Sequence, residues 1–134
     1  PEDVLKCYSE AYASRDVEML ESIVADDYTW VAVTFPRAEL FDREATMQAS
    51  RGLLTDEVVE SCSLDFGDNY VIVAGDDEDT WRIERVIVTL TVKIATEEQP
   101  HVSTVCGTFY VRRTDDEPGF EVYREATFEG VGCD

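Results

Sequence analysis

The sequence is poor in positive charge. Its 134 residues include 30 acidic residues against 11 basic ones, only Lys6 and Lys93 are lysines, and the formal net charge is −19. A surface of this sign repels the phosphates of nucleic acids and the headgroups of anionic lipids, so we expect neither nucleic acid nor a membrane as a partner. The composition fits either an ordinary acidic cytoplasmic protein or one adapted to high salt, where charge repulsion is screened over about 3 Å at 1 M.

The sequence also lacks long apolar runs and the common nucleotide and hydrolase motifs. No run approaches the roughly 18 to 20 apolar residues that a membrane-spanning helix needs. No signal peptide is visible, so we expect a cytoplasmic protein. The phosphate loops GxGxxG and GxxxxGK and the serine motif GxSxG do not occur. We therefore expect no cofactor.

Histidine and paired cysteines are scarce as well. His101 is the only histidine, and the four cysteines (Cys7, Cys62, Cys106 and Cys133) contain no CxxC pair. This spacing argues against a zinc site and predicts reduced thiols that pack as small apolar residues. A Cys–His nucleophile pair is an alternative that no supporting motif favours.

The N-terminal third of the chain shows helical periodicity. Apolar residues at i, i+4 and i+7 predict a first helix up to Ser14, and Asp16 is a suitable N-cap for a second. We expect the second helix to end at an acidic turn, Asp26–Asp27, followed by a strand over residues 28–33. A third helix is predicted from Arg43 to about residue 54, with Asp42 as its N-cap.

The remainder is rich in strand patterns. We predict a hairpin of residues 58–66 and 70–74, then strands over 81–96, 101–113 and 120–128. Helices followed by strands, without a late crossover helix, indicate an α+β fold with an antiparallel sheet of about five to six strands, in a single domain over residues 1–134. The 81–96 strand is apolar on both faces, which predicts a homodimer through the outer sheet face.

This order of elements resembles the NTF2-like superfamily. The segment A-x-x-x-R-D-x-x-x-L-x-x-x-x-A-D-D, Ala11 to Asp27, is similar to a signature of its SnoaL-like and steroid delta-isomerase branch. The resemblance implies a cone in which three helices pack on a strongly curved sheet around a pocket, and dimers that form through the outer sheet face. The isomerases' oxyanion-donating Tyr falls on Tyr8, but their general-base and protonated Asp fall on Ala32 and Gly107. We therefore do not expect that isomerase chemistry, which needs both carboxyl groups.

Two kinds of residue are candidates for the pocket. The first are aromatic residues that would line a small apolar pocket: Tyr8, Tyr12, Trp30 and Phe109. The second are charged residues: Arg85 and Arg124, which alternate with apolar neighbours and would need a carboxylate such as Glu60 or a ligand anion, and His101, at the start of a strand.

Two functions agree with these observations. The favoured one is a small-molecule-binding or assembly domain with an apolar pocket. The alternative is a cofactor-independent SnoaL-like isomerase, cyclase or dehydratase acting on a small apolar carbonyl compound, with Tyr8 or Tyr12 polarising the carbonyl group. A void of at least about 300 Å³ with a titratable group reaching into it would favour the enzyme.

Overall fold

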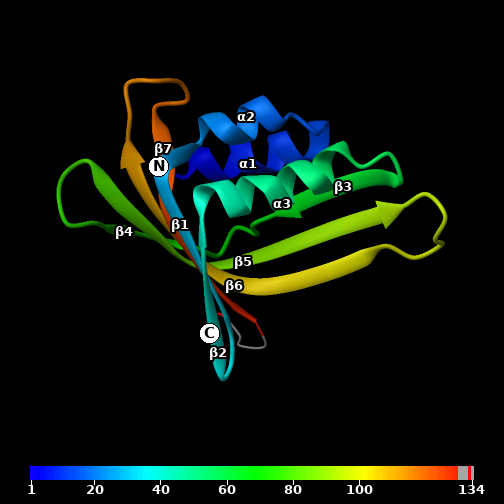
Figure 1. The fold of residues 1–134 in the computed structure, drawn as a ribbon. Coiled ribbons are helices and arrows are strands. Elements are labelled where there is room, and N and C mark those ends of the chain that lie inside the picture. Colours follow the sequence, from blue (N-terminus) through cyan, green and yellow to red (C-terminus); the bar gives the residue numbers. More distant parts are fainter. Residues whose placement is uncertain (130–132, 134) are drawn as a thin grey trace.

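The computed structural model describes residues 1–129 and 133, and in these residues three helices lie on one side of a seven-stranded sheet (Figure 1). The helices are α1 (Asp3–Ser14), α2 (Val17–Ser22) and α3 (Arg43–Thr55). The strands are β1 (Val24–Thr34), β2 (Arg37–Asp42), β3 (Val59–Asp65), β4 (Val71–Ala74), β5 (Thr80–Ile94), β6 (His101–Arg113) and β7 (Phe120–Glu129). The predicted α+β class and the curved sheet are confirmed, with more strands than expected.

Both predicted helix caps are present. The Asp16 carboxylate accepts a hydrogen bond from the Met19 N–H at 3.0 Å, and that of Asp42 accepts one from the Ala45 N–H at 2.8 Å. Each bond satisfies a backbone donor that the first turn of a helix leaves free. The second helix is shorter than predicted, because Val24 already pairs with Val122 of β7. The expected acidic turn, residues 26–27, therefore lies within β1.

The strand order is β2-β1-β7-β6-β5-β3, with β4 on β5, and two predictions about it are wrong. The sheet is not wholly antiparallel, since β1 and β7 are parallel. The hairpin of residues 58–66 and 70–74 does not form, because β3 and β4 both pair with β5, at residues 89–94 and 81–84 respectively. The 15-residue β5 is long enough for both partners. Strand β2, which pairs with β1, was not predicted.

Four irregularities interrupt the described sheet. The register shifts in β1 between Val24 and Thr29, in β3 between Val59 and Ser61, in β5 between Ile83 and Val86, and between β6 and β7 at Tyr110. A β-bulge bends its strand and reverses the alternation of side chains beyond it. In Figure 1 the long strands curve beneath the helices, so that the inner face of the sheet faces α1 and α3.

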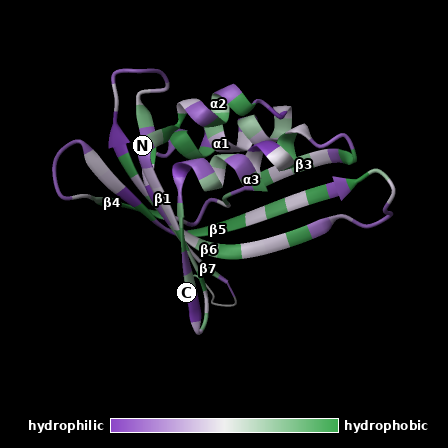
Figure 2. Cartoon of the chain, in the orientation of Figure 1, coloured by the Kyte–Doolittle hydropathy of each residue, from purple (hydrophilic) through white to green (hydrophobic). Residues whose placement is uncertain are grey.

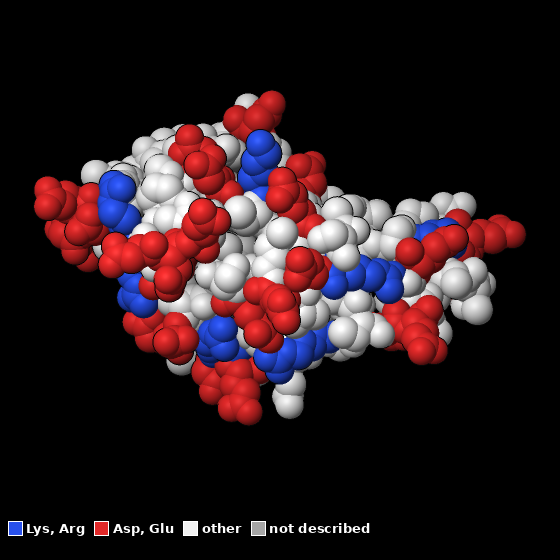
Figure 3. Space-filling model, turned by 90° about the horizontal axis from the view of Figure 1, so that it is seen from above, with Lys and Arg blue, Asp and Glu red and all other residues white. Residues whose placement is uncertain are grey.

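The core lies between the helices and this inner face. Leu5 and Tyr8 of α1 and Met47 of α3 are buried against sheet residues that include Ile83 and Phe109. Figure 2 shows the corresponding alternation of hydrophobic and hydrophilic residues along the helices and along β5. Acidic side chains outnumber basic ones on the face seen from above the helices (Figure 3). No helix in the described residues is long and apolar enough to cross a membrane.

The prediction of four reduced cysteines is wrong for two of them. Cys106 and Cys133 form a disulfide, whereas Cys7 and Cys62 are free thiols. Cys106 is adjacent in sequence to Gly107, which faces inward, so its side chain lies on the outer face of β6. The two cysteines are 27 residues apart and belong to no spacing motif, so the sequence does not indicate that they form a pair.

Candidate functional site

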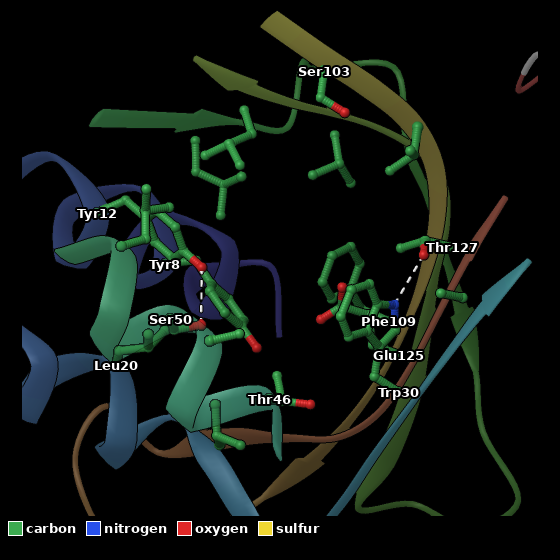
Figure 4. A pocket seen from close by; sticks show the side chains of 18 of the residues that line it. Tyr8, Tyr12, Leu20, Trp30, Thr46, Ser50, Ser103, Phe109, Glu125 and Thr127 are labelled. Atoms are coloured by element: carbon green, nitrogen blue, oxygen red, sulfur yellow. Dashed lines mark hydrogen bonds between the residues drawn. The ribbon is translucent and has the colours of Figure 1, made fainter. Parts of the chain in front are cut away.

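A cavity of about 430 Å³ lies between the helices and the inner face of the sheet (Figure 4). Helices α1, α2 and α3 contribute to one wall, and strands β1, β3, β5, β6 and β7 contribute to the other. Most of the lining is apolar or aromatic. Its aromatic residues are Tyr8, Tyr12, Tyr28, Trp30, Phe66 and Phe109, and its polar residues include Glu125 and Thr127.

Glu125 of β7 is the central polar group of this cavity. The Tyr28 hydroxyl donates a hydrogen bond to its Oε1 atom at 3.0 Å. Burial raises the pKa of the Glu125 carboxyl from 4.5 to about 7, although the bond from Tyr28 acts in the opposite direction. A carboxyl group with this pKa exchanges protons at neutral pH in both directions, which suits a general acid or base.

The polar tips of the aromatic residues differ in their bonding. The Tyr12 hydroxyl lies 3.3 Å from Ser50 Oγ, and the Trp30 indole N–H donates to Thr127 Oγ1 at 2.9 Å. The Tyr8 hydroxyl has no hydrogen-bond partner among the described residues, and burial holds its pKa well above 10. Tyr8 and Glu125 lie on opposite sides of the cavity in Figure 4. The Tyr8 phenol is thus a neutral donor that is free to bind a ligand.

A bulge in β7 turns Glu125 inward. Tyr110 of β6 pairs with Arg124, but the next residue, Val111, pairs with Val122, so Tyr123 is an extra residue in β7. Val122 faces the core before the bulge, and Glu125 faces the cavity after it. Strict alternation from Val122 places residue 124 inside and residue 125 outside, so sequence reasoning selected the wrong residue. The pairing of Glu125 with Phe109 and Trp30 is visible only in the folded sheet.

No protein-family model and no curated protein matches the sequence. Solved structures do match along nearly the whole chain. An NTF2-like protein of unknown function from Rhodospirillum rubrum is 19% identical, with a TM-score of 0.71 over 96% of each chain. A proposed scytalone dehydratase from Novosphingobium aromaticivorans is 15% identical, with a TM-score of 0.76 over 97% of this chain and 81% of that one. A proposed dehydratase of the NTF2-like family from Streptomyces avermitilis is 14% identical, with a TM-score of 0.67 over 96% and 92%.

The chain has the NTF2-like fold. Identities this low define the architecture and leave activity open. The resemblance inferred from the order of elements and from the Ala11–Asp27 segment is thereby confirmed at the level of the fold.

Within this NTF2-like cone the four predicted aromatic residues, Tyr8, Tyr12, Trp30 and Phe109, all line the cavity. The Phe109 ring contacts the ring of Tyr8 edge to face, with centroids 6.0 Å apart.

The three predicted charged residues lie outside the cavity. Arg124 is exposed and its guanidinium lies over the Tyr110 ring, 5.4 Å from the centroid, because the β7 bulge turns it outward. Arg85 is exposed with a φ of 60°, because it lies in the β5 bulge. His101 lies at the exposed end of β6, with Nε2 2.6 Å from a carboxylate oxygen of Glu97.

The suggested buried Arg–Glu pair is also absent from the described residues. Glu60 is exposed, and its carboxylate lies 3.6 Å from Lys93 Nζ. At the two isomerase positions, Ala32 lines the cavity and Gly107 packs under Val88 and Phe109. A Cβ atom at residue 107 would lie 3.2 to 3.3 Å from both. The cavity carboxyl of this chain therefore sits at a different position, on β7. Among the described residues, no group of His, Cys, Asp and Glu could hold a metal ion.

Proposed function

We propose that this NTF2-like protein is a cofactor-independent enzyme in which Glu125 transfers a proton to or from a small, mainly apolar carbonyl compound. The observation that carries this proposal is the carboxyl group of Glu125, with a pKa of about 7, on the wall of a cavity of about 430 Å³. A titratable group in a cavity of this size is what the enzyme alternative required. The solved relatives proposed to be dehydratases give weaker support, because their likeness to this chain concerns the fold.

Each step of this chemistry has a group to perform it. The Glu125 carboxylate removes a proton from the carbon next to the carbonyl, which leaves a neutral Glu125 acid and an enolate. The free Tyr8 hydroxyl donates a hydrogen bond to the enolate oxygen, where negative charge develops. The Glu125 acid then returns the proton to another carbon, which is isomerisation, or to a departing hydroxyl group, which releases water and is dehydration. Tyr28 holds the carboxyl group in place through its Oε1 atom.

A simple ketone tests the proton-transfer step without knowledge of the natural substrate. We propose to follow deuterium uptake from D₂O at the carbons next to the carbonyl of 2-tetralone by ¹H NMR. Glu125→Gln should lower the protein-catalysed rate by about 10²-fold or more, and Tyr8→Phe by about 10²-fold. Glu10→Gln, at an exposed position on α1, removes the same charge and is the matched control. An exchange rate that is unchanged in Glu125→Gln would refute the proposal.

A binding protein without chemistry is the second candidate. It is favoured by the bonds that already engage the polar tips of Tyr12, Trp30 and one oxygen of Glu125. A protein of this kind would bind 2-tetralone with no acceleration of exchange, and Glu125→Gln would change its affinity only modestly.

We further propose that the chain forms a homodimer through the outer face of the sheet. Phe128, Cys106 and Ile87 are consecutive partners across β7, β6 and β5 on this face. Ile87 and Phe128 are 43% and 38% exposed, which is unusual for large apolar residues in the middle of a sheet. Sedimentation equilibrium should give a molecular mass of twice the 15.1 kDa of one chain. The Ile87→Glu variant should have the mass of a single chain. A monomer at micromolar concentration of the unmodified protein would exclude this dimer.

A further inference from the structure

Among the described residues, the charged side chains that line the cavity are all acidic. Its ionisable lining residues are two glutamates, Glu125 and Glu129, and three tyrosines, and the described lining contains no Lys, Arg or His. The three basic residues that the sequence predicted for the cavity, Arg85, His101 and Arg124, all lie outside it. An anionic ligand would therefore enter a poorly solvated space beside Glu125 with no opposite charge to compensate for its lost hydration.

Glu125 itself lacks a charged partner. Its single hydrogen bond among the described residues comes from a neutral phenol, that of Tyr28, and no salt bridge to it is present there. Because no opposite charge stabilises the carboxylate, the neutral, protonated form of the carboxyl group is favoured. A cation placed beside it would supply that charge and would favour the carboxylate.

Aromatic rings complete the surroundings of this group. Tyr8, Phe66 and Phe109 contact each other edge to face, with centroid separations of 5.9, 6.0 and 5.5 Å. Trp30 adjoins Glu125 across the β1–β7 pair. The faces of aromatic rings attract cations, most strongly where water is excluded.

We propose that the natural ligand of this cavity is an organic cation, an ammonium group on a compact apolar body, bound with its positive charge beside Glu125. The inference rests on the same cavity as the proposed enzyme and names the charge class of its substrate. Binding is coupled to a proton: below about pH 7 the incoming cation displaces a proton from Glu125, so the affinity rises as the pH rises.

Three probes of the same shape and different charge test this proposal. Phenyltrimethylammonium, tert-butylbenzene and benzenesulfonate each carry a tetrahedral head on a phenyl ring, with charges of plus one, zero and minus one. Calorimetric titration in about 0.15 M salt screens the long-range attraction that a net charge of −19 exerts on any cation. We expect the cation to bind about tenfold more tightly than tert-butylbenzene at pH 8.5. Benzenesulfonate should not bind.

Two further measurements assign this preference to Glu125. In the unmodified protein, the ratio of the affinity for phenyltrimethylammonium to that for tert-butylbenzene should fall towards one at pH 5.5. At pH 8.5 Glu125→Gln should remove the preference and keep the affinity for tert-butylbenzene, whereas Glu10→Gln should keep the preference. The pH series requires no variant, so it decides the question even where Glu125→Gln folds poorly.

Several outcomes would overturn the inference. They are equal affinity for the cation and tert-butylbenzene at pH 8.5, measurable binding of benzenesulfonate, a preference that survives in Glu125→Gln, and no binding of any probe. If 2-tetralone still exchanges its protons under Glu125 control, the enzyme proposal stands while the cation proposal fails. If the cation preference is found without that exchange, the cavity is a binding site and the enzyme proposal fails.

Discussion

Replacing Glu125 by Gln should change how the stability of the protein depends on pH. The pKa of this carboxyl is about 7 in the folded chain and 4.5 when it is exposed to water. Between these two values the folded state binds more protons than the unfolded state. The free energy of unfolding must therefore fall as the pH rises through this window, and it should level off above about pH 7.

The size of the effect follows from the two pKa values. Each pKa unit corresponds to about 1.4 kcal/mol, so between pH 5 and pH 8.5 ionisation of Glu125 should cost at most about 2 to 3 kcal/mol of stability. Urea unfolding at the two pH values measures this change in the unmodified protein. Since the other acidic groups contribute equally to both proteins, subtracting the same change measured for Glu125→Gln isolates the contribution of this carboxyl.

The variant should thus be the more stable of the two proteins at pH 8.5, where the unmodified chain holds a partly buried carboxylate without a cation. Gln has nearly the same shape as Glu and can still accept the bond from Tyr28. Glu10→Gln, which removes an exposed carboxylate, should give a difference near zero. A difference below about 0.5 kcal/mol between Glu125→Gln and the unmodified protein would mean that Glu125 is hydrated in the folded state, and would refute the reasoning.

Three other perturbations have defined outcomes. Tyr28→Phe removes a donor to the charged form of Glu125, so the pH midpoint of 2-tetralone exchange should rise by about one unit; an unchanged midpoint would show that this bond does not tune the carboxyl. Cys133→Ser opens a 27-residue loop and should lower the free energy of unfolding by about 3 kcal/mol, and thiol reductant should then have no further effect on the unfolding midpoint. If the surface is adapted to high salt, the thermal midpoint should rise steadily from 0.1 to about 3 M KCl as repulsion among 30 acidic residues is screened; a flat profile would exclude this adaptation.

Local patterns were enough to predict the helices and the class of the fold. Asp16 and Asp42 are caps whose partners lie three residues away, and an apolar stripe such as that of α1 depends only on helix geometry. The order of elements then predicted the curved sheet and the aromatic side of the cavity. Tyr8 and Tyr12 were found because they lie on that stripe.

The polar side of the cavity depends on irregularities that local patterns do not record. Because Tyr123 is an extra residue in β7, Arg124 faces outward and Glu125 faces inward, which is the reverse of strict alternation. A similar bulge turns Arg85 outward. A strict alternation rule fails beyond each bulge. A glutamate flanked by Arg124 and Ala126 within a strand gives no local sign that it lines a cavity. The partner of Cys106 was missed for a similar reason, because the chain returns to it only after the last strand.

The parallel pair of β1 and β7 has a consequence for how the protein folds. Thr29 pairs with Arg124 and Trp30 with Glu125, so the paired residues of the two strands that meet at the cavity are 95 positions apart in a chain of 134 residues. Contacts of such high sequence separation form late and slow the folding of a domain. During synthesis on the ribosome the helices, the β1–β2 pair and the β3–β5–β6 part of the sheet can form first, whereas β1 can pair with β7 only at the end. The carboxyl-bearing wall of the cavity is therefore completed only when the last strand has emerged, and a chain interrupted before residue 120 contains most of the fold, with Tyr8 and Tyr28, but lacks Glu125.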